Sequence, residues 1–154
     1  MPKKINDEIF NVMSSIIKDF DSVIDYVLKR KEFKLSDVEK TIFKKRIKGI
    51  IATESRGKIN VKNGSAGEVG IMQIKPVVSH SIEKLYFIPV SPKIDLKNVE
   101  DNILIGSLLL YDNYIKSDRD IDLATQRYNQ GWIEKTNIKS LAYLTLVKGF
   151  ENYG

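Results

Sequence analysis

Glu54 is the side chain in this sequence best placed for acid–base chemistry. It follows the apolar run Ile-Ile-Ala-Thr at residues 50–53, so one side of the residue should lie against the protein core. Burial raises the pKa of a carboxyl group because it disfavours the charged form, and a carboxyl group with a pKa near neutral can act as a general acid. An exposed glutamate near a helix end is the plainer interpretation, and Glu54 taken alone favours it.

A glycine-containing segment, Gly-Glu-Val-Gly-Ile-Met-Gln at residues 67–73, follows downstream. Two glycines permit a tight backbone turn and close approach to a ligand. Gln73 brings an amide that can bind a sugar hydroxyl or hold Glu54, and Glu68 adds a second acid. The segment lacks the lysine and the Ser/Thr of a phosphate-binding loop. A plain glycine-rich turn before an apolar element is the alternative interpretation.

Two further segments combine polar or small residues with apolar ones. Residues 102–106, Asn-Ile-Leu-Ile-Gly, place a glycine on the apolar side of a predicted helix, which indicates close packing against a neighbouring helix. Residues 128–132, Tyr-Asn-Gln-Gly-Trp, combine aromatic rings, an amide and a hydroxyl before a glycine turn. This mixture suits a carbohydrate, which presents hydroxyl edges and an apolar ring face. A helix end with a buried tyrosine is the plainer interpretation.

The elements that position Glu54 can be predicted from apolar spacing. Between residues 5 and 27 apolar side chains recur at steps of three and four, which predicts a helix, and we expect a break in it within residues 19–22. A second helix should run from about residue 37 to about residue 55, because Ser36 begins the capping-box pattern Ser-x-x-Glu. Glu54 then lies in the last turn of that helix.

The rest of the chain also favours helices. Asn98 and Asp120 can cap two of them, and a last helix should begin at about Asn137. Residues 56–76 lose periodicity and gather glycines, so we expect an irregular connection that can include a short β-hairpin. Prolines bracket another loop at residues 89–92. The predicted fold class is mostly α.

The composition indicates one globular domain without metal or disulfide chemistry. The chain has 154 residues, of which 42% are hydrophobic and 29% charged, which are ordinary globular values. We expect a single domain over residues 1–154, with 1–35 as a helical scaffold and 36–154 as the motif-bearing core. There is no cysteine and only one histidine, His80, so we expect no metal site and no cofactor.

The charge pattern narrows the choice of partner only slightly. A net charge of +5 suits a polyanionic partner such as a bacterial wall or nucleic acid, but a lysine-rich surface explains it equally well. No basic face interleaved with aromatic residues is recognisable, so we do not expect nucleic-acid binding. No apolar run approaches the roughly 18 residues of a membrane span, and a secretory signal is not recognisable.

Taken in order, the motifs resemble the catalytic domain of the soluble lytic transglycosylases, which are goose-type-lysozyme-like enzymes. The matches are Glu-Ser at 54–55, Gly-x-x-Gly-Ile-Met-Gln at 67–73, Asn-Ile-x-x-Gly at 102–106 and Tyr-Asn-x-Gly at 128–131. The predicted C-terminal helix with Tyr143 continues the match. The resemblance implies a mostly helical, lysozyme-like fold with a substrate cleft between lobes.

The resemblance also implies a reaction. Glu54 would be a single acid/base that cleaves the β-1,4 bond between N-acetylmuramic acid and N-acetylglucosamine in peptidoglycan, forming a 1,6-anhydro sugar without water, metal or cofactor. The substrate-binding residues that the resemblance implies are Ser55, Met72, Gln73, Tyr128 and Asn129. The expected partner is the glycan strand alone, bound by a monomer that acts at the periplasm or wall.

Two alternatives stay open on the sequence. Glu68 stands where the family commonly has alanine, and it could position water so that the enzyme hydrolyses the same bond. A non-catalytic wall-binding or assembly module would keep the fold without turnover. Because no leader is recognisable, we expect delivery by a bacteriophage, passage through a holin, or a mature secreted form.

Overall fold

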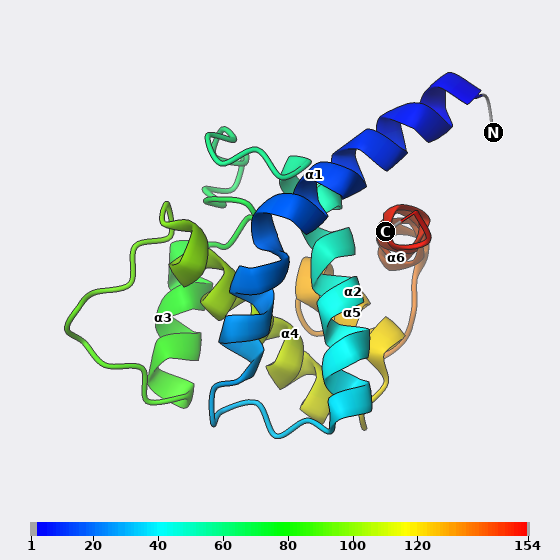
Figure 1. Ribbon diagram of the computed structural model, residues 1–154. Coiled ribbons are helices and arrows are strands. Elements are labelled where there is room, and N and C mark those ends of the chain that lie inside the picture. The colour runs from blue at the N-terminus through cyan, green and yellow to red at the C-terminus, as the bar shows by residue number, and fades with distance from the viewer. Residues whose placement is uncertain (1–2, 154) are drawn as a thin grey trace.

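The fold is almost entirely helical, as the sequence predicts. The computed structural model describes residues 3–153 of the chain (Figure 1). Its helices are α1 (Lys3–Leu28), α2 (Asp37–Ser55), α3 (Pro76–Leu85), α4 (Val99–Lys116), α5 (Ile121–Gln130) and α6 (Ile138–Glu151). Within the described residues, strand pairing is limited to one antiparallel bridge between Val69 and Ile74. Where the sequence predicts that residues 56–76 can include a short β-hairpin, the structure has only this single bridge.

The second helix, α2, begins and ends where the sequence predicts. The Ser36 hydroxyl accepts a hydrogen bond from the Glu39 N–H at 3.1 Å, and the Glu39 carboxylate accepts one from the Ser36 N–H at 3.0 Å. Both bonds satisfy amide groups that a helix start leaves unpaired. At the other end Arg56 adopts a left-handed φ of 54°, which ends the helix directly after Ser55. Glu54 thus occupies the last turn.

The first helix, α1, differs from its prediction. Hydrogen bonding is helical throughout Lys3–Leu28, so the expected break within residues 19–22 is wrong. Ile16, Phe20 and Ile24 are all buried in the core, and this spacing of four carries the helix through the polar residues of that stretch. Figure 1 shows that α1 changes direction along its length. Its N-terminal part still contacts the C-terminal end of the chain, where the Tyr153 hydroxyl donates a hydrogen bond of 2.8 Å to the Asn6 side-chain oxygen.

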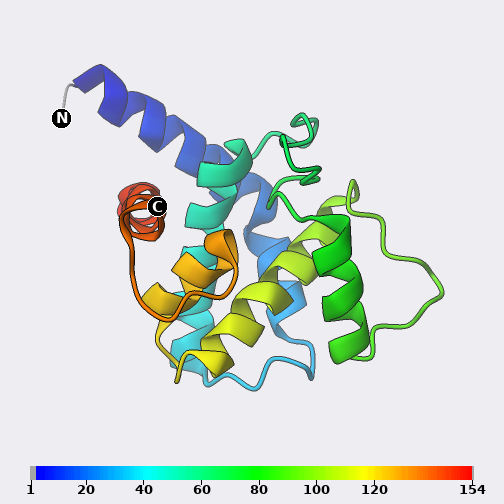
Figure 2. The same cartoon turned by 180° about the vertical axis from the view of Figure 1, so that it is seen from behind.

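The sequence prediction missed α3. Pro76 is the first residue of this helix, a position that proline favours because its missing N–H is not needed there. Ile82 and Ser79 give it a buried side, and it packs beside α4 (Figure 2). His80 lies within this helix. The irregular connection predicted for residues 56–76 therefore ends at Lys75, and Pro76 begins a helix.

Gly49 lies directly against Val147, where α2 packs on α6. A Cβ atom on Gly49 would lie 2.8 Å from the backbone oxygen of Val147, which is closer than van der Waals contact allows. Only glycine therefore lets the two helices pack at this distance. One turn before Val147, Tyr143 lies on the same helix, so this packing also brings Tyr143 towards the end of α2.

We predict that Gly49→Ala destabilises the protein relative to Gly149→Ala. Both changes gain up to about 1 kcal/mol of helix propensity, but overpacking at Gly49 should cost about 1–3 kcal/mol. Gly149 is a matched control, because a Cβ there would meet no atom within 4 Å. Urea unfolding at equal protein concentration measures the difference. Equal midpoints for the two variants would contradict the close packing of α2 on α6.

Candidate active site

A cavity of about 430 Å³ contains the residues that the sequence singles out for chemistry. Its walls come from the end of α2, the segment at 66–75, the middle of α4 and the end of α5. Polar residues on these walls are Glu54, Glu68, Gln73, Lys75, Asp112, Asn113, Arg127, Tyr128, Asn129, Gln130 and Trp132. Segments that are far apart in the sequence thus meet around Glu54.

The pKa of Glu54 is raised to about 7, so that both its protonated and its charged form are populated near neutral pH. Burial is the largest cause of the shift; a hydrogen bond from the Tyr143 hydroxyl opposes it, and the negative charge of Glu68 adds to it. That hydroxyl lies 3.0 Å from a Glu54 carboxylate oxygen. Desolvation is the dominant effect. A carboxyl group with this pKa can both donate and accept a proton at neutral pH.

Two tyrosines next to Glu54 act as neutral hydroxyl groups. The Tyr128 hydroxyl donates a hydrogen bond of 2.7 Å to the backbone oxygen of Met72, and Tyr143 donates to Glu54. Burial and the Glu54 charge raise the pKa of both tyrosines well above the ordinary value. The hydroxyl of Tyr143 stabilises the Glu54 carboxylate once the proton has left. The sequence prediction did not assign Tyr143 this contact, because the two residues are 89 positions apart.

The buried side chain of Asn102 holds the glycine segment in place. Its amide oxygen accepts a hydrogen bond from the Met72 N–H at 2.8 Å, and its amide nitrogen donates to the backbone oxygens of Val69 and Leu96, each at 2.8 Å. Gly70 has a φ of +80° and lies directly against this amide, so a Cβ at Gly70 would collide with it. The segment and α4 therefore form one unit.

Ser55 and Met72 support the cavity from behind. The Ser55 hydroxyl donates to the Ile51 backbone oxygen at 3.1 Å and accepts from the Gly57 N–H at 3.1 Å, so it closes the end of α2. The buried Met72 side chain packs on Gly106, where a Cβ would collide with its sulfur. The interpretation of Gly106 as a helix–helix contact is corrected accordingly: the glycine makes room for a side chain of the segment.

Gln73, Asn129 and Glu68 do line the cavity. The Gln73 amide nitrogen donates to the Gly70 backbone oxygen at 2.9 Å, an arrangement that shapes the turn rather than holding Glu54. Asn129 is exposed at the end of α5. One carboxylate oxygen of Glu68 is buried without a hydrogen-bond partner among the described residues, and its charge acts on Glu54 as noted above.

The cavity includes residues that the sequence prediction did not assign. Asp112 and Asn113 face it from α4, and Arg127 from α5. Asp112 accepts a hydrogen bond from the Tyr86 hydroxyl at 3.0 Å and pairs with Lys116 at 2.8 Å. No local pattern marks these residues, since each looks like an ordinary polar position on a helix. Only the packing of the helices brings these residues to the cavity that Glu54 also lines.

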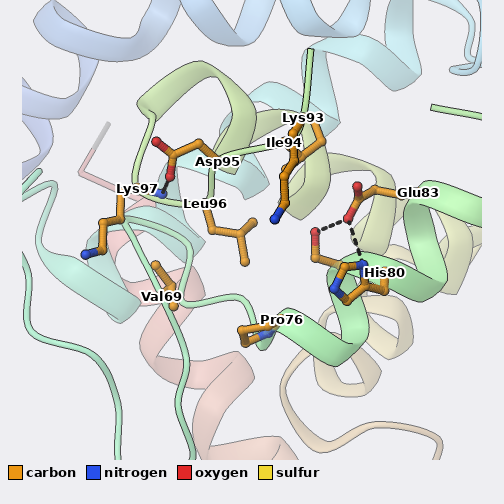
Figure 3. A pocket seen from close by; sticks show the side chains of 10 residues that line it. Val69, Pro76, His80, Glu83, Lys93, Ile94, Asp95, Leu96 and Lys97 are labelled. Carbon is orange, nitrogen blue, oxygen red and sulfur yellow. Dashed lines mark hydrogen bonds and ion pairs between the residues drawn. The ribbon is translucent and has the colours of Figure 1, made fainter. Parts of the chain in front are cut away.

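A second cavity, of about 420 Å³, is lined by residues of the 69–76 segment, of α3 and of the loop at 93–97 (Figure 3). Figure 3 shows His80 beside Glu83, with 3.8 Å between the His80 Nδ1 and a Glu83 carboxylate oxygen. Ser79 donates to the same oxygen at 2.9 Å. His80 lines this second cavity and is not among the residues that line the Glu54 cavity. Over residues 3–153 no group of three or more potential ligands could hold a metal ion, and no helix is long and apolar enough to cross a membrane.

Comparison with known proteins identifies the fold and the family. A solved structure of an inactive mutant of lytic transglycosylase Slt from Pseudomonas aeruginosa matches with a TM-score of 0.69 and 17% sequence identity. The match covers 88% of this chain and 24% of the other, so this chain spans about a quarter of that protein. The family model described as "Transglycosylase SLT domain" matches residues 33–144.

The chain therefore belongs to the transglycosylase SLT domain family. This finding confirms the resemblance drawn from the ordered motifs, and the structural match confirms the mostly helical, lysozyme-like fold. No curated protein matches the chain.

We predict that Glu54→Gln stabilises the protein more at pH 8 than at pH 4. The folded pKa of Glu54 is about 7 against an ordinary value of 4.5, so the folded state holds a proton that the unfolded chain releases between these pH values. This contribution to stability is complete below pH 4.5 and is lost as pH rises through 7. The loss amounts to about 3 kcal/mol.

Unfolding in urea at the two pH values measures the effect on the free energy of unfolding. Glu100→Gln, at an exposed position outside the cavity, is the matched control. A difference between Glu54→Gln and the wild type that stays constant with pH would contradict the buried, protonated carboxyl group.

Proposed function

We propose that this chain is a peptidoglycan lytic transglycosylase that cleaves the β-1,4 bond between N-acetylmuramic acid and N-acetylglucosamine. The observation that carries the proposal is the Glu54 carboxyl group, which lies on the wall of a cavity at the end of α2 and whose pKa burial raises to about 7. Membership of the transglycosylase SLT domain family supports it. The matching Slt structure is that of an inactive glutamate-to-glutamine mutant of a lytic transglycosylase, which supports such a role.

Glu54 would act twice in the reaction. Its protonated form donates a proton to the glycosidic oxygen, and the bond to the muramic acid C1 breaks. The neighbouring acetamido group of the substrate stabilises the cationic centre at C1. The Glu54 carboxylate then accepts the proton of the C6 hydroxyl, whose oxygen bonds to C1 and closes the 1,6-anhydro ring. One side chain can serve both steps because its pKa lies near the working pH.

The neighbours of Glu54 fit this cycle. Tyr143 donates a hydrogen bond to the Glu54 carboxylate, which stabilises it between the two proton transfers. Gln73 and Asn129 present amides on the cavity wall, where they can bind sugar hydroxyl and acetamido groups. We assign Tyr128, Met72 and Ser55 to shaping the site, since their polar groups are occupied by the protein itself.

A hydrolase with the same Glu54 is the second candidate, and one observation favours it. Glu68 lies on the same cavity, and one of its carboxylate oxygens has no hydrogen-bond partner among the described residues. A free carboxylate oxygen near the general acid can hold a water molecule. In that case water, rather than the C6 hydroxyl, would attack C1 and leave a reducing sugar end.

We further propose that the chain works as a monomer on the glycan strands of the bacterial cell wall. The helix α1 would serve as scaffold, since it packs on α2, α4 and α6. A non-catalytic wall-binding module is disfavoured by the raised pKa of Glu54, because a binding role alone does not call for a buried acid.

Glu54→Gln should lower turnover of purified peptidoglycan by about 10²–10⁴-fold or more, the usual contribution of general acid–base catalysis. Pelleting with insoluble peptidoglycan should show that binding persists, because glutamine keeps the size and polarity of the side chain. Glu100→Gln is again the control and should keep the wild-type rate. Wild-type activity in Glu54→Gln would remove Glu54 from the mechanism.

Glu68→Gln separates the two candidate reactions. If the chain is a transglycosylase, mass spectrometry of the digest should still show 1,6-anhydromuramic acid ends. As pH rises, the rate should also begin to fall at a lower pH than in the wild type. The reason is that loss of the Glu68 charge lowers the pKa of Glu54. Reducing muramic acid ends in the wild-type digest, lost together with activity in Glu68→Gln, would establish the hydrolase instead.

A further inference from the structure

Trp132 is an exposed aromatic side chain on the wall of the Glu54 cavity. It is the single tryptophan of the sequence and is 60% exposed. It directly follows Gly131, which ends α5 with a φ of 74°, so the turn carries the indole away from the helix. Exposure of a large apolar ring to water is unfavourable. A ligand that covers the ring would remove this cost.

Arg127 holds this ring from one side. The centre of its guanidinium group lies 3.6 Å from the centroid of the Trp132 ring, a distance at which the two planes stack. The guanidinium itself is fixed: its Nε donates to the Ile133 backbone oxygen at 2.8 Å, and its Nη1 donates to the Ser117 hydroxyl at 2.7 Å. Arg127 is buried, so the stack has little freedom to move.

The partners of Arg127 are neutral. Within residues 3–153 no carboxylate lies within ion-pair distance of its guanidinium. The ring face and two uncharged oxygens therefore balance a buried cation, and stacking on Trp132 is part of what keeps it there. The indole of Trp132 is therefore held in a defined orientation, with one of its faces covered by Arg127.

We infer that Trp132, positioned by Arg127, is a stacking platform for an N-acetylated sugar ring of the glycan strand. A pyranose ring presents an apolar face of C–H groups that matches an indole face, while the amides of Asn129 and Gln130 on the same wall can bind its polar edge. The platform contacts the sugar rather than the peptide of the substrate. The inference rests on the proposed function, since it names the part of peptidoglycan that this site recognises.

The single tryptophan makes binding directly measurable. The full chain carrying Glu54→Gln is titrated with a peptide-free tetramer of β-1,4-linked N-acetylglucosamine while tryptophan emission is recorded. We expect a saturable change in emission intensity or wavelength. The same change should appear in a variant that also carries Tyr26→Ala, an exposed aromatic outside the cavity. No change up to millimolar ligand, or a change only with peptide-bearing fragments, would overturn the inference.

Kinetics of the active enzyme test the contribution of Trp132 to substrate binding. Trp132→Ala should raise KM for soluble glycan strands by roughly tenfold, the effect of one aromatic stacking contact, with kcat within threefold of the wild type. Trp132→Phe should recover part of the affinity. A KM for Trp132→Ala equal to that of Tyr26→Ala would refute the platform.

Arg127 is tested as a positioning residue through the same readouts. Arg127→Met removes the fixed cation, and we expect a red-shifted, ligand-insensitive Trp132 emission together with a raised KM. Arg127→Lys should restore part of the ligand response. Circular dichroism checks that these variants fold. If Arg127→Met does not fold, the KM of Trp132→Phe still tests the inference. Because emission is followed without turnover, failure of the platform is distinguishable from failure of the Glu54 mechanism, which only the lytic assay reports.

Discussion

The burial of one carboxyl group is the constraint on which the rest of the site depends. Glu54 lies in the last turn of a helix that runs through the core, a place where an acid gains nothing from the helix dipole. Its raised pKa is a direct consequence of desolvation. A hydrogen bond from the Tyr143 hydroxyl offsets part of this cost by stabilising the charged form. Under the proposed mechanism, the desolvation that lowers stability above pH 7 also gives Glu54 the pKa that a general acid needs.

Two packing contacts keep the surroundings of that carboxyl group in place. Gly49 lets α6 approach α2, and through it Tyr143 reaches Glu54. On the other side Asn102 ties the glycine segment to α4 with three hydrogen bonds. Met72 then presents its backbone oxygen to Tyr128. The motifs that recur in order along the chain are thus mostly contacts that fix the cavity walls, and few of them need to touch a substrate.

Sequence reasoning succeeded where the relevant signals are local. The capping box at Ser36 and the apolar spacing after it placed α2, and hence Glu54, correctly. Prediction was wrong where a local signal had two meanings: the polar stretch at 19–22 is spanned by a helix whose buried side continues, and Pro76 begins α3 instead of ending a loop. In both places the buried contacts of the folded chain decide between alternatives that the sequence leaves balanced.

By itself, the sequence determined the helical class, the position of Glu54 at a helix end and the order of motifs that indicates the family. These follow from periodicity, capping and residue type, which act over a few positions. The tertiary structure decided the pKa of Glu54, its pairing with Tyr143 and the stacking of Arg127 on Trp132. It also placed Ser55 and Met72 outside the lining of the cavity, with their polar groups hydrogen-bonded within the protein. Burial and long-range contacts set these properties, and neither exists until the helices have packed together.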